Sequence, residues 1–524
     1  MREYPKIDAA WLVNGLFQDN AGGKNQPYLE TLTNMRCDKT GAVGLDPVTQ
    51  VPAGTVTLWP FPQLCAAEDR QIVFSGTARD GATVGVWDAT STAPVGTNVW
   101  QAQAPLSLYA TPHSGYPWQF AAMRDLWIAA NGSCLVWHLP YDANATGITG
   151  APVACNAVCH NRHRLFLGGL SGSWFNESTS APWASIMDAW RKTQPHTVMV
   201  NEAMSFGANW VVWSERSGGA QDVPYYPLLV MLGAYGTSAF NTLKESLITR
   251  IESGELGMAP VRGCGTVCAM APLGEDVIVY GRTGISELNV DQEGVRYTEK
   301  MRHSESVPLG SIIGQGPLTH LVILESGDLT EITPQGTSLT SFRHIFHGRA
   351  GLCHYDPTYN EFWIGAGTAG GYIWNGRALS GPHDINPSGM LRRGTVLWMT
   401  SKQIPDTLPV VVQTCPFSLS ERGSKHVNEM IAECEGITSM QGSIPWRIKS
   451  SGAFTNGTAV PFNDNDVAFP HQSAVDAKIR ITGSLTGSNP SIGAIGLRFQ
   501  YEDKRFKRGP SGTSRSGASV EADS

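Results

Sequence analysis

The chain has 524 residues, of which 41% are apolar, and it contains 57 glycines and 32 prolines. The many glycines and prolines predict a mainly β protein. The 16 tryptophans and 17 phenylalanines argue against a disordered chain, because they must be buried. The formal net charge of −7 argues against a basic nucleic-acid-binding protein of the ordinary kind. It does not exclude a surface past which DNA slides.

The N-terminal sequence has no basic region followed by an apolar core, so no signal peptide is expected. The longest apolar run, residues 225–235, is shorter than the roughly 18 residues that a membrane helix requires. The ten cysteines are scattered along the chain and are expected to be reduced, buried thiols, because they do not form the dense framework of a small secreted domain.

Residues 1–51 are polar, with weak periodicity and turn signals at Asn14-Gly15 and Asp46-Pro47. This pattern predicts an extended N-terminal arm.

Residues 52–395 contain a repeated pattern, which is clearest in 261–289. An apolar strand at 277–280 follows a strand of small residues, and the turn 281–284 reverses the chain into a further strand. Related patterns recur at intervals of roughly 40 to 64 residues, and four-stranded propeller blades recur at about 40 to 50. The region is therefore predicted to be a β-propeller of six or seven blades, although any glycine-rich β chain shows loose spacing near forty. The residues that mark the repeats are Cys65, Trp118, Cys159, Met204, Cys268, Ile313 and Cys353.

Two segments interrupt the repeat. Residues 176–209 fit strands poorly and are interpreted as an excursion from a blade edge. The segment near 241–258 explains the longest interval, because Leu243, Leu247 and Ile251 lie on one face of a predicted helix.

From residue 396 to 509 the strands are more widely spaced. In 495–501, apolar residues alternate with glycine or polar ones, which predicts a half-buried strand. The fold predicted for 396–509 is a C-terminal β-sandwich, followed by a disordered tail at 510–524 that is rich in glycine and serine.

Three stretches of the sequence resemble the tail nozzle proteins of short-tailed bacteriophages, also called tail-hub or DNA-stabilisation tail accessory proteins. They are residues 28–35, residues 161–170, and the pair 478–483 and 497–505. The resemblance covers most of the chain, but neither the excursion at 176–209 nor the predicted helix matches the family.

This resemblance implies a structural virion protein that forms a homohexameric ring at the distal end of a short tail. The ring would enclose the DNA ejection channel, and genome DNA would pass without sequence-specific binding. Other expected partners are the adaptor ring and the tail fibres or spikes, and a contact of the distal face with the host cell surface stays open.

The strongest metal candidate is the cluster Cys155, Cys159, His160 and His163. On a strand, however, the two thiols lie about 13 Å apart, and Cys264 repeats the spacing to Cys268 without any histidine, so small core residues are favoured. No metal, cofactor or catalytic residue is therefore predicted, and the chain is not expected to be an enzyme.

Enzymatic and peptide-binding propellers carry repeated signatures that are missing from this sequence. The sequence around Asp80-Gly81 is similar to one sialidase Asp box, but it occurs once and is interpreted as a hairpin turn. Trp87-Asp88 is likewise a single dipeptide. No pair of carboxylates can be nominated for glycoside hydrolysis, and the basic cluster at 504–508 favours a solvated terminus or a subunit contact over a DNA contact.

Two alternatives remain, a propeller glycan-binding or depolymerising tail protein and a cellular propeller scaffold. A nozzle requires a ring whose channel is wider than a DNA duplex, whereas a glycan protein requires a carboxylate-lined pocket and a scaffold a narrow channel. The negative charge predicts an acidic or mixed wall for the nozzle channel, because a basic wall would hold phosphates. Carboxylates that could contribute to this wall are Asp276, Glu287, Asp291, Glu293, Glu245, Glu252 and Glu255.

Overall fold

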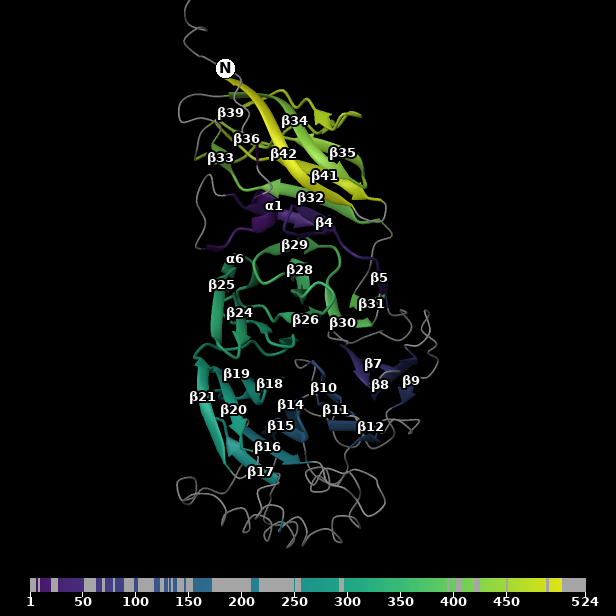
Figure 1. Cartoon of the computed structure of the whole chain (residues 1–524), viewed down its shortest axis with the longest axis vertical. Coiled ribbons are helices and arrows are strands. Elements are labelled where there is room, and N and C mark those ends of the chain that lie inside the picture. Colours follow the sequence, from purple (N-terminus) through teal and green to yellow (C-terminus); the bar gives the residue numbers. More distant parts are fainter. Residues whose placement is uncertain are drawn as a thin grey trace, which may run out of the picture. The chain divides into compact units, whose positions relative to one another are not determined.

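The computed structural model describes residues 6–7, 10–19, 27–50, 63–67, 71–78, 81–88, 99–101, 117–122, 127–130, 132, 135–138, 146–147, 154–171, 209–215, 249, 256–291, 296–393, 396–401, 407–418, 425–448, 451–486 and 490–501. The chain is mainly β and folds into two compact units (Figure 1). Within the described ranges, no helix has the length and hydropathy of a membrane span. The first unit comprises Met1–Asp46, Gly370–Ile385 and Gln403–Ser524, and the second comprises Pro47–Ala369 and Asn386–Lys402.

The described part of the second unit contains five four-stranded antiparallel sheets, each built from four strands that follow one another in the sequence. The first sheet is β6 (Gln63–Ala67), β7 (Gln71–Ala78), β8 (Gly81–Asp88) and β9 (Val99–Gln101), and the second is β10 (Gln119–Ala122), β11 (Trp127–Ala130), β12 (Leu135–His138) and β13 (Thr146–Gly147). The third is β14 (Ala154–Asn161), β15 (Arg164–Ser171), β16 (Trp210–Glu215) and β17 (Leu256–Pro260). The fourth is β18 (Val267–Leu273), β19 (Asp276–Gly281), β20 (Ile285–Val290) and β21 (Tyr297–His303), and the fifth is β22 (Gly314–Gln315), β23 (His320–Ile323), β24 (Asp328–Thr333) and β25 (Gly336–Ser341).

Two smaller groups of strands complete this unit. β26 (Leu352–Asp356) and β27 (Glu361–Gly365) form an antiparallel hairpin. β30 (Pro387–Arg393) pairs with β31 (Val396–Ser401), and β5 (Val48–Gln50) joins β31 in parallel. An early segment of the chain is therefore paired with one that follows it by almost 350 residues. The short helix α6 (Arg343–Phe346) follows β25.

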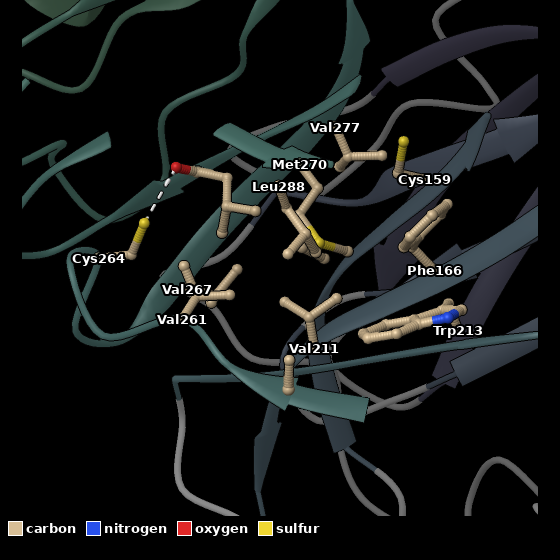
Figure 2. Packing of buried hydrophobic residues seen from close by; sticks show 13 residues of the cluster. Cys159, Phe166, Val211, Trp213, Val261, Cys264, Val267, Met270, Val277 and Leu288 are labelled. Carbon is tan, nitrogen blue, oxygen red and sulfur yellow. Dashed lines mark hydrogen bonds between the residues drawn. The ribbon is translucent and has the colours of Figure 1, made fainter. Parts of the chain in front are cut away.

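The fourth sheet is buried on both faces. Alternate side chains of a strand point to opposite sides of a sheet, so each face is identified by its own set of residues on β19. Val277 and Val279 of β19 belong to a cluster with Phe166 and Trp213 of the third sheet. Figure 2 shows this contact, with Met270 and Leu288 packed towards Val211 and Phe166. The third and fourth sheets therefore pack face to face.

The opposite face of the fourth sheet packs on the fifth. Ile278 and Tyr280, which alternate with the two valines, share a second cluster with Val322 and Ile332. The continuous apolar run 277–280 is explained by this two-sided burial, as a strand with one wet face would alternate apolar and polar residues.

The first strands of successive sheets are neighbours. Contacts join β6 to β10, β10 to β14, β14 to β18, β22 to β26, β26 to β30, and β30 back to β6. Ile313, next to β22, packs with Ala269 and Ala271 of β18.

The described part of the first unit contains two larger antiparallel sheets and one small sheet. One larger sheet has the strand order β3-β4-β42-β34-β38, and in it β1 also pairs with β42 and β39 with β34. In the other larger sheet the strands of this unit follow the order β28-β29-β2-β32-β41-β35-β37. The small sheet has the order β33-β40-β36. The elements of this unit are β1 (Lys6–Ile7), α1 (Ala10–Asn14), β2 (Leu29–Thr33), β3 (Met35–Cys37), β4 (Ala42–Gly44), β28 (Gly371–Trp374), β29 (Leu379–His383), β32 (Pro409–Thr414), β33 (Phe417–Ser418), β34 (Lys425–Glu435), β35 (Ile437–Ser443), β36 (Trp446–Arg447), β37 (Val460–Pro461), β38 (Val467–Ala468), β39 (Gln472–Ala474), β40 (Asp476–Ala477), β41 (Arg480–Leu485) and β42 (Ser491–Tyr501). The short 3-10 helix η3 (Gly367–Ala369) belongs to the second unit.

The units differ from the predicted ranges at both ends of the repeat region. The predicted arm 1–51 supplies β1 to β4 of the first unit and β5 of the second, and Val396–Ser401 belongs with β30 and β5 rather than with 396–509. Residue Met204 lies outside the described residues. The strand after it, β16, is the third strand of the sheet that begins with β14, so it does not begin a sheet of its own.

The predicted excursion 176–209 lies outside the described residues except for residue 209, and the tail 510–524 lies outside them entirely. Of the predicted insertion near 241–258, the structure describes one helical residue, Thr249, and the start of β17.

Candidate functional site

The first strands of the second unit border a cavity of about 220 Å³. Its lining comes from β10, β14, β18, β26 and β30 and from the segment at β22, so strands from most of the successive sheets meet there. The lining residues are Gln119, Phe120, Val158, Ala269, Met270, Ile312, Ile313, Gln315, Cys353, His354, Tyr355 and Met390.

Four polar side chains, one of them that of Tyr355, distinguish this cavity from the apolar core. Gln119 donates a hydrogen bond from Nε2 to the backbone carbonyl of Cys268, at 2.6 Å. His354 has no hydrogen-bond partner for Nε2 among the described residues, and burial lowers the pKa of its imidazole to about 4. Gln315 is exposed and therefore lies where the cavity meets solvent. The surface of the cavity is thus more polar than apolar.

The sequence did not single out these polar residues, although a signal was available. Each follows a repeat-marking residue by one or two positions: Gln119 follows Trp118, Gln315 follows Ile313, and His354 follows Cys353. Because adjacent strand residues point to opposite sides, a polar residue directly after a buried marker, as at Gln119 and His354, is a candidate for the cavity.

The metal candidate on β14 does not form a group of ligands. Cys155 and Cys159 are buried strand residues, and burial raises the pKa of both thiols. His160 is the next residue of β14, and His163 is in the turn before β15. Among the residues that the structure describes, no three His, Cys, Asp or Glu side chains are arranged to hold a metal ion.

The other cysteines occupy core positions. Eight described cysteines are free, and seven of these are buried. Cys264 donates a hydrogen bond from Sγ to the carbonyl of Val279 (Figure 2), and Cys268 is 4% exposed. The predicted role of the Cys264 and Cys268 pair as small core residues agrees with this packing.

Gly81 of the predicted Asp80-Gly81 turn lies at the start of a strand. Gly81 begins β8 and is paired with Ala78, the last residue of β7, so the chain reverses between them. This geometry fits the predicted hairpin, although Asp80 itself is outside the described residues. Trp87 and Asp88 end β8.

Two of the carboxylates considered for a channel wall are engaged within the chain. Asp276 accepts a hydrogen bond from the side-chain amide of Asn289, and Glu287 forms an ion pair with Arg302. Asp291 is half-buried. Glu245, Glu252, Glu255 and Glu293 are outside the described residues.

Two of the stretches that resemble the nozzle family meet in one sheet of the first unit. β2, from the stretch 28–35, pairs with β32, and β32 pairs with β41, from the stretch 478–483. Lys478 Nζ lies 2.7 Å from Glu30 Oε1, and Gln413 Nε2 donates to Glu30 Oε2 at 2.7 Å. The third stretch, 161–170, forms the turn between β14 and β15 and most of β15.

No protein-family model matches this chain, and no curated protein shows significant similarity.

Proposed function

We propose that the chain is a structural virion protein that forms the nozzle of a short phage tail. In this proposal the second unit is a seven-bladed β-propeller, the first unit is a β-sandwich, and six copies form a ring around the DNA ejection channel. The partners would be the adaptor ring, tail fibres or spikes, and genome DNA, which passes without sequence-specific contacts.

The order of neighbouring strands supports the propeller. Six sheets or hairpins begin at β6, β10, β14, β18, β22 and β26, and the β30-β31-β5 group follows. The first strands are neighbours from β6 onwards, and β30 returns to β6. A radial arrangement explains both this cyclic order and the burial of the fourth sheet on its two faces.

The contact between Glu30 and Lys478 carries the nozzle proposal. These residues lie 448 positions apart in two stretches that resemble the family. They form an ion pair between Glu30 of β2 and Lys478, which precedes β41. A chance likeness of short phrases would not require the phrases to meet in the fold. The contact supports the proposal because it brings together two of the stretches on which the resemblance rests.

The size of the cavity requires that DNA pass outside the propeller axis. A DNA duplex, whose two grooves alone are about 8.5 and 7.5 Å deep, is too wide for the cavity of about 220 Å³ that the first strands border, and Gln119 bonds to the backbone of β18 beside this cavity. A duplex cannot be threaded through such a space. The proposed ejection channel is therefore enclosed by several subunits, as expected of a closed ring.

The proposal is tested by measuring the mass of the purified protein at several concentrations and its retention of duplex DNA. A nozzle should give a species of six times the monomer mass. It should not retain duplex DNA at physiological salt, because a wall rich in carboxylates binds no phosphates. Monomers at every concentration would contradict the ring, and strong, salt-sensitive DNA binding would contradict the sliding wall.

A further inference from the structure

The strands that complete the circle of sheets come from the segments that join the two units. β5 begins two residues after Asp46, where the first unit ends its first segment. β30 and β31 fill most of Asn386–Lys402, which lies in the sequence between two segments of the first unit. The β30-β31-β5 group, which contacts β6 and β26, is therefore connected along the chain directly to the first unit.

The link before β5 has little slack. Asp46 is held within the first unit by Arg36, whose Nη2 lies 3.4 Å from Asp46 Oδ1. Only Pro47 separates Asp46 from Val48, the first residue of β5. The proline ring fixes one of the two backbone dihedral angles of this residue, and two residues span at most about 7 Å. A larger shift of Asp46 must therefore move β5.

The link before β30 is equally short. Asp384 is fixed in the first unit by Asn34: the N–H of Asp384 donates to Asn34 Oδ1 at 3.0 Å, and Asn34 Nδ2 donates to Asp384 Oδ2 at 2.8 Å. Ile385, the next residue, is 1% exposed. Asn386 alone separates it from Pro387, where β30 begins. Both links thus run from a fixed residue of the first unit into a strand of the second within a few residues.

Within the β30-β31-β5 group, β5 is held less firmly than β31. β31 pairs with β30 along its whole length, and its residues Leu397 and Met399 are 1% and 0% exposed. β5 has three residues, and among the described strands it pairs with β31 alone, with Val48 beside Leu397. This pairing is parallel, which is slightly less stable per residue than an antiparallel one. Segments with few packed neighbours open at a lower free energy than core strands.

We propose that the pairing of β5 with β31 is a clasp through which the first unit controls the closure of the circle of sheets. While Asp46 is held by Arg36, β5 stays paired. A movement of the first unit that displaces Asp46 separates β5 from β31 and loosens the contacts of β30 and β31 with β6. Relative movement of two units of one chain is the ordinary expectation. The inference rests on the proposed propeller, because a clasp requires sheets that close on themselves, and it does not rest on the ring of six copies.

Hydrogen exchange of the full chain, measured by mass spectrometry, tests the clasp. Val48→Pro and Thr49→Pro are compared separately, because alternate residues of a strand direct their N–H groups to the same neighbour and proline removes this donor. At least one of the two variants should exchange about fivefold faster than the unaltered chain in β5, β31 and β6, the equivalent of one lost hydrogen bond. β19, in the sheet that is buried on both faces, should exchange as before.

Asp46→Asn tests the control by the first unit. The amide keeps the shape of the carboxylate but loses the charge that pairs with Arg36. Exchange in β5 and β31 should rise about two- to fivefold, as expected for the loss of one ion pair, whereas exchange in β34 and β42 of the first unit should not change. Thr340→Pro, in the outer strand β25 of the fifth sheet, is the matched control and should alter exchange in that sheet alone.

The outcomes separate the clasp from the propeller. Proline variants that leave β31 and β6 as protected as in the unaltered chain would overturn the clasp. An effect on β31 without one on β6 would overturn it together with the propeller, because the sheets would not close at this group. Faster exchange in the proline variants but not in Asp46→Asn would show closure without control by the first unit, and would also overturn the proposal. Equal loss of protection in every sheet would mean general unfolding, which contradicts a local clasp.

Discussion

The buried ion pair between Asp356 and Arg392 offers a quantitative test of how the second unit is held together. Asp356 ends β26 and Arg392 belongs to β30, and Arg392 Nη2 lies 2.6 Å from Asp356 Oδ2. The side chains are 0% and 5% exposed. The guanidinium also lies over the ring of Tyr359, 5.6 Å from its centroid. The pair therefore joins two of the neighbouring first strands.

Asp356→Asn should destabilise the second unit by about 3–5 kcal/mol, because removal of one partner leaves the other charge buried and uncompensated. The amide keeps the shape of the carboxylate, and its oxygen can still accept the bond that Oδ1 receives from the Thr358 N–H at 3.0 Å. The loss is thus assigned to charge rather than to packing. The double variant Asp356→Asn with Arg392→Met should be more stable than Asp356→Asn alone, because no unpaired charge remains.

The assay is urea unfolding followed by tryptophan fluorescence, with the transition of each unit fitted separately because the chain has more than one unit. The matched control is Arg282→Gln, which breaks a pair with Glu325 whose side chains are 39% and 46% exposed. An exposed pair contributes about 0–1 kcal/mol. Equal losses of stability in Asp356→Asn and Arg282→Gln would refute the reasoning. A double variant less stable than Asp356→Asn alone would also refute it.

Gly365→Ala should destabilise the protein by more than about 1 kcal/mol in the same assay, since a β-carbon there would collide with the carbonyl oxygen of Pro387; Gly336→Ala, where a β-carbon meets nothing within 4 Å, should be close to neutral, and equal effects would contradict the close approach. Burial lowers the pKa of His320 to about 4, so the unfolded chain, with an ordinary pKa near 6.5, takes up a proton first and stability should fall as the pH decreases from about 6.5 to 4. Melting temperatures measured across this pH range should show the fall in stability, and His320→Gln should make the fall smaller. An unchanged dependence of the melting temperature on pH in this variant would assign the fall to other groups. Burial raises the pKa of the Cys353 thiol to about 12, so iodoacetamide at pH 8 should label this residue in urea and not in the native protein, as peptide mass mapping can show, whereas rapid native labelling would contradict its burial.

The sequence predicted the mainly β class and most of the first strands for a physical reason. The repeat markers Cys65, Cys159, Cys268 and Cys353 are in β6, β14, β18 and β26, where a strand covered on both faces needs small or apolar side chains. The marker at Met204 failed because an apolar run such as Val211–Trp213 looks alike in the second and the third strand of a sheet.

Pairings between distant segments could not be predicted from local patterns. β5 has only three residues and joins β31 from the far end of the repeat region, and no feature of residues 48–50 names that partner. The ion pair of Glu30 with Lys478 likewise joins distant segments without a local signal in the sequence. The cavity was missed because Gln119, Gln315 and His354 become neighbours only when their strands meet. Periodicity within one segment carries no information about such meetings.

The most direct test of the nozzle account is a cryo-electron micrograph series of the purified protein, classified without imposed symmetry. The account predicts end-on views with six subunits around an opening wider than a DNA duplex, and a narrow, side-chain-filled axis within each subunit. Particles that are single subunits at all concentrations, or rings whose central opening is too narrow for a duplex, would contradict it.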